Sequence, residues 1–307
     1  MSDHPNERWR RLLDGGGPVL ADGAMGTMLF AAGLQFGDPP EVWNLAHPDV
    51  VRSVHRGYLE AGARIVLTNT FGGNALRLGL HGLEDRVDEL NRTAAILLRA
   101  EVEAAGGGAL VAGDIGPTGQ IMAPLGTLDY PTAVEAFAEQ ARALVAGGVD
   151  VLWIETMSDL EEVRAAIEGV RRVTTELPII ATMTFDTRGH TMMGVSPEQA
   201  VEAIAGWGAA AVGGNCGNGP EEIVPVIERM HRAAPDVVLV AKSNVGMPAL
   251  VGTQAVYRTE PATMAEWALR MRDAGATVIG ACCGSTPAHL AAMADALGVP
   301  RPPAPTG

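Results

Sequence analysis

The sequence predicts a single α/β domain built as a (β/α)8 barrel, or TIM barrel. Eight short runs of β-branched and apolar residues alternate with longer amphipathic segments along the 307-residue chain. Strands that are buried on both faces of a parallel sheet have this composition. Eight such units over about 280 residues match the size of this barrel. A doubly wound open sheet is the alternative, but no Gly-x-Gly-x-x-Gly sequence follows a predicted strand and opens a helix.

The expected strands are the eight apolar runs, each followed by small or polar residues. They cover residues 18–21, 65–67, 110–112, 151–154, 179–183, 211–212, 237–241 and 277–279. In a barrel, the carboxyl ends of all eight strands meet at one face, and the functional residues of such enzymes lie there. We therefore expect the polar residues that follow the strands to converge.

Amphipathic patterns between these runs predict the helices. They cover residues 47–61, 83–104, 130–146, 159–173, 220–233, 262–274 and 287–297, and one more begins at residues 196–199. The sequence Ser196-Pro197-Glu198-Gln199 is a capping box with proline in the first turn. The segment from Asp159 to Val173 is rich in glutamate early and in arginine late, which suits the helix dipole. We expect one barrel domain over residues 1–300 and a disordered tail over residues 301–307.

Composition excludes several classes of protein. The formal charge of −14 argues against nucleic-acid binding, which needs a basic face. No run of about 18 apolar residues predicts a membrane span, and the first residues lack the apolar core of a signal peptide. With only three cysteines and no disulfide framework, the chain fits a reducing cytoplasm. A homo-oligomer is compatible with this composition.

The three cysteines are the most informative residues. Cys216 follows one predicted strand, and the neighbours Cys282 and Cys283 follow another. Three thiolates can bind zinc and leave its fourth position open for a substrate. Successive strand residues point to opposite faces, so Cys282 and Cys283 can share a metal only if the strand breaks near Gly284. The alternatives are buried thiols that act as small apolar side chains, or zinc as a purely structural staple.

Other polar residues also follow the predicted strands: Asp22, Asn69, Asp114, Glu155, Asn215 and Lys242. Glu155 is the most informative of them, because an unpaired carboxylate beside a buried strand is costly. Asp22 could instead cap a turn, and the two asparagines could satisfy the loop backbone. Lys242 stands where Schiff-base lyases place their lysine, although pairing with an acid is the simpler interpretation.

Four motifs resemble the homocysteine S-methyltransferase family, and the resemblance spans residues 20–297. They are Asp-Gly-Ala-Met-Gly-Thr at 22–27, Thr-Asn-Thr-Phe-Gly-Gly-Asn at 68–74, Gly-Asn-Cys-Gly at 214–217 and Gly-Ala-Cys-Cys-Gly at 280–284. Bacterial betaine–homocysteine enzymes and the homocysteine module of cobalamin-dependent methionine synthase are the most similar branches. The family usually has a second glycine where this chain has Ala281, which is a small change.

The resemblance implies a TIM barrel that methylates L-homocysteine to L-methionine with the aid of Zn²⁺. It implies that Cys216, Cys282 and Cys283 are the zinc ligands. Glu155 matches the acid that holds the substrate ammonium, and Asp22 matches a second acid near it. Backbone amides around Gly23 and Met25 match those that receive the substrate carboxylate. The remaining residues of the implied substrate site are Ala24, Asn69 and Asn215.

The methyl donor is predicted less directly. Residues 113–122 and 184–195 resemble bacterial betaine–homocysteine enzymes, which favours betaine or a related onium compound. S-methylmethionine and a methyl-corrinoid protein partner are the alternatives. An onium donor favours an aromatic cage, for which the candidates are Trp43, Phe71, Tyr130, Phe185 and Tyr257. Asp114 or Asp129 could add charge attraction.

Overall fold

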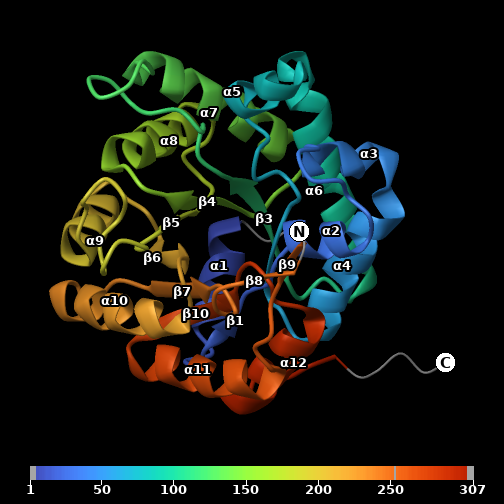
Figure 1. The fold of residues 1–307 in the computed structure, drawn as a ribbon, viewed down its shortest axis with the longest axis vertical. Coiled ribbons are helices and arrows are strands. Elements are labelled where there is room, and N and C mark those ends of the chain that lie inside the picture. Colours follow the sequence, from blue (N-terminus) through green and yellow to red (C-terminus); the bar gives the residue numbers. More distant parts are fainter. Residues whose placement is uncertain (1–4, 252–253, 303–307) are drawn as a thin grey trace.

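Eight parallel strands form the inner wall of the protein, and helices surround them (Figure 1). The computed structural model describes residues 5–251 and 254–302, so the expected disorder of residues 303–307 lies outside the described residues. The strand order is β1-β10-β7-β6-β5-β4-β3-β2. A parallel bridge between Ala21 and Ile65 joins β1 to β2, which stand at the two ends of this order. The Arg64 N–H also donates to the Leu20 carbonyl over 2.7 Å. The sheet therefore closes, and the predicted (β/α)8 barrel is confirmed.

All eight predicted strands are present. Their bounds are β1 Val19–Leu20, β2 Ile65–Leu67, β3 Leu110–Ile115, β4 Val151–Met157, β5 Ile179–Met183, β6 Ala211–Cys216, β7 Leu239–Ser243 and β10 Ala276–Ala281. Five strands, β3, β4, β6, β7 and β10, extend beyond their predicted ends. These extensions carry Asp114, Glu155, Cys216 and Lys242, so polar residues that were expected in loops lie near the carboxyl ends of strands.

Eight helices follow the strands on the outside. Their bounds are α4 Pro48–Glu60, α6 Val87–Ala104, α7 Tyr130–Ala146, α8 Leu160–Val173, α9 Pro197–Gly206, α10 Pro220–Ala233, α11 Pro261–Asp273 and α12 Pro287–Leu297. The capping box is confirmed, because the Ser196 side chain accepts from the Gln199 N–H and the Gln199 side chain accepts in return. The helix predicted at 83–104 starts later, because a 3-10 turn at Glu84–Arg86 precedes it.

Several elements were not predicted. Helix α1 (Pro5–Leu13) precedes the barrel, and short helices α2 (Gly26–Ala31), α3 (Trp43–Ala46) and α5 (Ala75–Leu78) lie in the loops after β1 and β2. Three 3-10 turns lie at Pro40–Val42, Gly79–His81 and Glu84–Arg86. An antiparallel pair, β8 (Ala249–Val251) and β9 (Gln254–Val256), follows β7. Within the described residues, no helix is long and apolar enough to cross a membrane.

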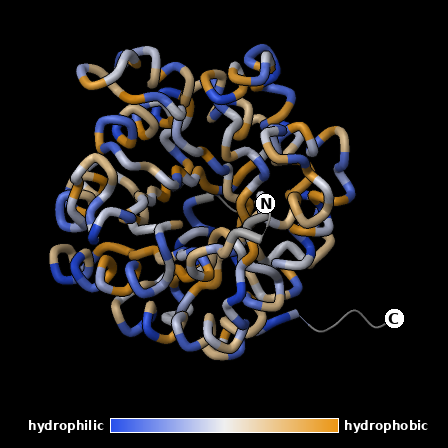
Figure 2. The backbone as a smooth tube through the Cα atoms, in the orientation of Figure 1, coloured by the Kyte–Doolittle hydropathy of each residue, from blue (hydrophilic) through white to orange (hydrophobic). Residues whose placement is uncertain are grey.

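Alternating strand residues divide the core into two clusters. The inner cluster packs Val19, Ile65, Leu110, Val151 and Trp153 with Trp9 of α1. The neighbouring positions, such as Val111 and Leu152, join the larger cluster between strands and helices. Apolar residues accordingly run along the inner segments, whereas hydrophilic residues lie on the outside (Figure 2). Because side chains alternate with period two, the inner rows of β3 and β4 continue from Leu110 and Val151 to Asp114 and Glu155. The fold thereby aims these two acids into the barrel.

Candidate metal and substrate site

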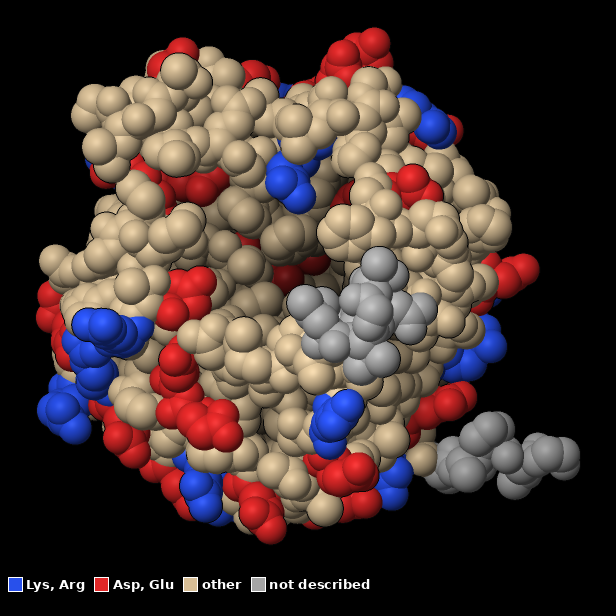
Figure 3. Space-filling model, viewed as in Figure 1, with Lys and Arg blue, Asp and Glu red and all other residues tan. Residues whose placement is uncertain are grey.

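A cavity of about 470 Å³ opens at the carboxyl ends of the strands. Figure 3 looks into this hollow and shows acidic side chains at its base. Its walls contain residues from the ends of seven of the eight barrel strands. They include Asp22–Thr27, Leu67–Gly72, Asp114, Glu155, Thr156, Cys216, Lys242, Cys282 and Cys283. The predicted convergence of polar residues on one face is confirmed.

The three thiols lie together on one side of this cavity. Their sulfur atoms all lie within 4.8 Å of one another, and Cys216 Sγ is 2.9 Å from Cys282 Sγ. The geometric condition for a shared metal is met, because β10 ends at Ala281 and Gly284 turns the chain with a φ of 82°. Cys282 and Cys283 therefore lie beyond the strand and can point to the same side.

Asn244, which the sequence analysis did not select, holds the two cysteine loops together. Its side-chain amide donates to the Gly217 carbonyl over 2.5 Å, and its side-chain oxygen accepts from the Cys283 N–H over 3.0 Å. The Cys282 N–H donates to the Ser243 carbonyl over 2.7 Å. The loop after β7 thus connects the thiol of β6 to the two thiols after β10. An asparagine after a strand was the only sequence signal for this role.

The thiols influence one another's ionisation. Hydrogen bonds to Cys282 and Cys283 raise the pKa of Cys216 well above its usual range. Hydrogen bonds donated by Cys216 and Cys282 lower the pKa of Cys283 to about 4. The cluster thus favours the ionisation of one thiol and disfavours the ionisation of the other two. All three thiols can become thiolates only if a cation binds among them. Zn²⁺ prefers this set of soft, closely spaced sulfur ligands, so the residues present fit a zinc ion.

Glu155 is held at the end of β4 by an unusual turn. Thr156 has a left-handed φ of 61°, which costs about 1–3 kcal/mol in a residue other than glycine. Asn215 offsets this cost, because its side-chain oxygen accepts from the Thr156 N–H and its amide donates to Thr156 Oγ1, over 2.8 and 2.7 Å. Asn215 is fully buried and is not among the residues that line the cavity. Asn215 therefore holds the Glu155–Thr156 turn in place from within the protein, outside the cavity.

The acids in the cavity differ in what surrounds them. Asp22 has both oxygens occupied, by the Leu67 N–H and by Lys242 Nζ, over 2.7 and 2.8 Å. Glu155 has only weak partners, with Asn215 Nδ2 at 3.5 Å and Lys242 Nζ at 3.9 Å. Burial raises the pKa of Glu155 to about 8. Glu155 thus remains available to a cationic group of a ligand, which would favour its ionised form.

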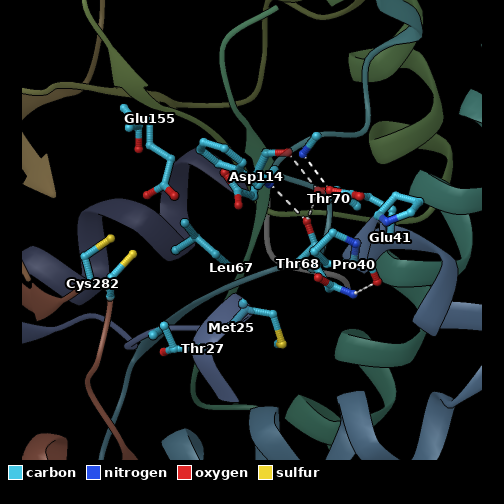
Figure 4. A pocket seen from close by; sticks show the side chains of 18 of the residues that line it. Met25, Thr27, Pro40, Glu41, Leu67, Thr68, Thr70, Asp114, Glu155 and Cys282 are labelled. Atoms are coloured by element: carbon cyan, nitrogen blue, oxygen red, sulfur yellow. Dashed lines mark hydrogen bonds between the residues drawn. The ribbon is translucent and has the colours of Figure 1, made fainter. Parts of the chain in front are cut away.

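The other residues predicted for the substrate site can now be placed in the structure. Gly23, Ala24, Met25 and Asn69 all line the cavity (Figure 4 labels Met25). A side chain at Gly23 would clash with Ser285, Tyr58 and Leu290, because its Cβ would lie 2.5–2.9 Å from them. The Ala24 N–H donates to Ser285 Oγ over 2.9 Å. No hydrogen bond within the described residues engages the N–H groups of Gly23 and Met25, so both can receive an anion.

The predicted aromatic cage is not assembled. Of the five candidates, only Phe71 lines the cavity, where Phe30, which was not predicted, is the other aromatic residue among those described. Tyr130 donates to Glu168 on the outer helices, Phe185 is buried in the core, and Trp43 packs on His47. Tyr257 lies against Gly284. Asp129 caps α7 by accepting from the Thr132 N–H.

Comparisons with known proteins agree on one family. Residues 19–297 match the family model described as homocysteine S-methyltransferase. Methionine synthase from Mycobacterium tuberculosis is 34% identical in an alignment 293 positions long, which covers 91% of this chain and 24% of that protein. The chain thus spans about a quarter of the length of the curated relatives that it matches.

Solved structures give the same match. The oxidized form of the homocysteine methyltransferase MmuM from Escherichia coli superposes with a TM-score of 0.79 at 26% identity, covering 94% of this chain and 99% of that one. The metallated form of the same protein superposes with a TM-score of 0.78, covering 93% and 98%. The similarity therefore includes the whole barrel of a homocysteine methyltransferase.

Proposed function

The chain belongs to the homocysteine S-methyltransferase family, and we propose that this methyltransferase depends on zinc and converts L-homocysteine to L-methionine. One observation carries the proposal. Three thiols within 4.8 Å of one another face a cavity that also presents a weakly paired carboxylate, Glu155. This arrangement provides a metal site for a sulfur atom and a cation site for an ammonium group in one cavity.

Cys216, Cys282 and Cys283 would hold the zinc ion. When bound, zinc would lower the pKa of the homocysteine thiol, which is about 8.5 for a free thiol, so that the sulfur reacts as a thiolate at neutral pH. The similar barrel of MmuM has been solved in a metallated form, which supports the proposal. A reducing compartment such as the cytoplasm would keep the three thiols free for the metal.

The residues of the chain orient the amino acid. Glu155 would pair with the homocysteine ammonium, since its carboxylate lacks a close partner. The free N–H groups of Gly23 and Met25 would receive the homocysteine carboxylate. With both ends of the amino acid fixed, its side chain points to the thiols. Because binding has already fixed the orientation of the substrate, the entropic cost of bringing two substrates together is reduced in the reaction step.

In the transfer step, the homocysteine sulfur attacks the methyl carbon of the donor. The new carbon–sulfur bond uses an electron pair of the thiolate, and the pair of the broken bond leaves with the donor. No proton moves in this step, so no side chain has to act as a general base. The chain contributes the position and orientation of the two substrates.

We propose a small onium compound, such as betaine, as the methyl donor. The buried acids that line the cavity, Asp22, Glu41, Asp114 and Glu155, outnumber its one buried cation, Lys242, which favours a cationic second substrate. S-methylmethionine has the same onium chemistry. A methyl-corrinoid protein partner is the second candidate, because the chain matches about a quarter of methionine synthase.

Mass spectrometry of methionine tests the proposal. Zinc-loaded, reduced protein is incubated with homocysteine and, separately, with betaine, dimethylsulfoniopropionate, S-methylmethionine or methylcobalamin. Turnover with an onium compound is the expected result. Turnover with methylcobalamin alone would move the donor to the corrinoid class. No methionine from any donor, in protein that holds one zinc ion per chain, would contradict the proposal.

A further inference from the structure

Two buried hydroxyl groups hold the loop after β1, which carries Gly23 and Met25. The Tyr58 hydroxyl, on α4, donates to the Ala24 carbonyl over 2.7 Å, and Ser285 Oγ accepts from the Ala24 N–H over 2.9 Å. Both side chains are only 1% exposed, so these bonds are shielded from water. The two hydrogen-bonding groups of Ala24 are therefore both occupied by side chains from other parts of the chain.

Ser285 also belongs to the loop that carries two of the three thiols. It follows Cys282, Cys283 and Gly284 in the sequence, and its N–H donates to the Cys282 carbonyl over 3.2 Å. The Tyr58 hydroxyl lies 3.4 Å from the Ser285 carbonyl, so it contacts this loop as well. The two hydroxyl groups thus join the loop after β1 to the loop after β10.

Two further hydrogen bonds connect the same loops. The Ala281 N–H donates to the Asp22 carbonyl over 3.1 Å where the two strands end. The Gly284 N–H donates to Thr27 Oγ1 over 3.2 Å, and Thr27 lines the cavity (Figure 4). The contact through Ala24 lies between these two along the loop after β1, so the loop is bonded to its neighbour at its start, its middle and its end.

Packing fixes the same part of the loop. A Cβ atom at Gly23 would lie 2.5 Å from Ser285 Oγ and 2.8 Å from the Tyr58 ring. It would also lie 2.9 Å from Leu290, on α12. The backbone of the loop therefore lies directly on these side chains. The free N–H groups of Gly23 and Met25 consequently have a defined position relative to the thiols.

In the proposed function, homocysteine bridges the two loops, since its carboxylate meets the N–H groups of Gly23 and Met25 and its sulfur joins the metal at the thiols. Resting on that function, we propose that Tyr58 and Ser285 are positioning residues for homocysteine, which set the separation between the carboxylate site and the metal site. Neither residue is among those that line the cavity, so both act through the backbone of the loops. The substrates that they favour are thiols with a carboxylate at the matching distance.

A fixed separation strengthens the binding of a ligand that is held at both ends. Once the sulfur is held at the thiol site, the carboxylate is already concentrated near its N–H groups, as for the second contact of any bivalent ligand. If the two loops could move independently, the second contact would also have to order a loop, which lowers the affinity. The hydroxyl groups of Tyr58 and Ser285 should therefore affect a ligand with both a thiol and a carboxylate, and not a thiol alone.

Calorimetric titration of matched ligands and variants tests the inference. Zinc-loaded protein is titrated with homocysteine and, in competition with it, with 3-aminopropanethiol, which keeps the thiol and the amine but lacks the carboxylate. The variants are Tyr58→Phe and Ser285→Ala, each of which removes one hydroxyl group and keeps most of the packing. The matched controls are Tyr130→Phe, on α7, and Ser53→Ala, on α4, which remove the same groups from hydrogen bonds on the outer helices. Zinc content and thermal unfolding are measured to show that every protein is loaded and folded.

We expect Tyr58→Phe and Ser285→Ala each to raise the Kd of homocysteine by about fivefold to tenfold, as for the loss of a buried hydrogen bond. The Kd of 3-aminopropanethiol and the zinc content should stay within about twofold of the wild type, and the controls should match the wild type throughout. An unchanged homocysteine Kd in both variants would overturn the inference. An equal loss for both ligands would also overturn it, because the effect would then lie at the thiols. Either result leaves the proposed function intact, whereas failure of the wild-type protein to bind homocysteine would refute that function itself.

Discussion

Lys242 Nζ donates a hydrogen bond of 2.8 Å to the Asp22 carboxylate, although the two residues are 220 positions apart in the sequence. The second Asp22 oxygen accepts from the Leu67 N–H, so Asp22 supports the site, whereas Glu155 has no partner closer than 3.5 Å. The carboxylates of Asp22 and Glu155 raise the pKa of Lys242 above its usual value, against the effect of burial. A protonated lysine is not a nucleophile, which argues against the Schiff-base lyase considered from the sequence.

The Lys242–Asp22 pair should contribute to stability. We expect Lys242→Met to lower the free energy of unfolding by about 3–5 kcal/mol, because it leaves the buried Asp22 charge without its partner. The double variant Lys242→Met/Asp22→Asn should recover part of the loss. Urea denaturation of the three proteins measures both effects. A single variant as stable as the wild type would show that the pair does not hold the site together.

Glu155 should determine the affinity for homocysteine. We expect Glu155→Gln to raise the homocysteine KM by about tenfold to a hundredfold, because the amide cannot pair with the ammonium as an ion. The zinc content should not change, since Glu155 is not one of the clustered metal-site residues. Steady-state kinetics and metal analysis check both statements. An unchanged homocysteine KM would move the ammonium site to another residue, such as Asp114.

Each of the three thiols should be essential. We expect Cys216→Ala, Cys282→Ala and Cys283→Ala each to abolish zinc retention and turnover, because two thiolates hold zinc too weakly. The melting temperature should change only slightly on zinc removal, since the barrel core is extensive and separate from the thiols. Metal analysis, the methionine assay and calorimetry measure these effects. Full activity in any one variant would contradict the zinc mechanism, and unfolding of the metal-free protein would favour a structural zinc.

His55 should make stability depend on pH. Its side chain is fully buried on α4, both ring nitrogens lack partners, and burial lowers its pKa to about 4. The unfolded chain takes up a proton below about pH 6.5 and the folded protein does not, so stability is full above that pH and falls as the pH drops towards 4. The loss from this group reaches about 2 kcal/mol at about pH 5.

The matched variant for this effect is His55→Leu, which has no titratable group. Urea denaturation at about pH 7.5 and about pH 5 should show a smaller difference for the variant than for the wild type. Equal differences for the two proteins would mean that His55 is protonated in the folded state or that its site opens to water.

Local patterns in the sequence explain why much of the fold could be predicted. The strands are short β-branched runs, and the period-two alternation that buries Val151 and Trp153 also carries Glu155 into the barrel. The cysteines and Glu155 could be selected because thiols and an acid directly after apolar strands are unusual. Helix α1 was missed, because its role depends on Trp9 reaching the inner cluster of the barrel.

The remaining features depend on contacts between distant segments. The register of β7 against β10 sets Lys242 opposite Gly280, beside the end of β1, where it reaches Asp22. Asn244 gains its role only when the loops after β6 and β10 meet. The aromatic cage was predicted from loop position alone, and the structure directs Tyr130 and Phe185 elsewhere. Loop conformations of this kind are not specified by local periodicity.

Zinc K-edge X-ray absorption before and after the addition of homocysteine tests the proposed metal site most directly. We predict three sulfur ligands in the zinc-loaded protein, from Cys216, Cys282 and Cys283, and a fourth sulfur ligand when homocysteine binds. The fourth ligand should be absent when homoserine, which has a hydroxyl group in place of the thiol, is added. A sulfur count that does not change with homocysteine, or zinc held by oxygen and nitrogen atoms alone, would contradict the proposed site.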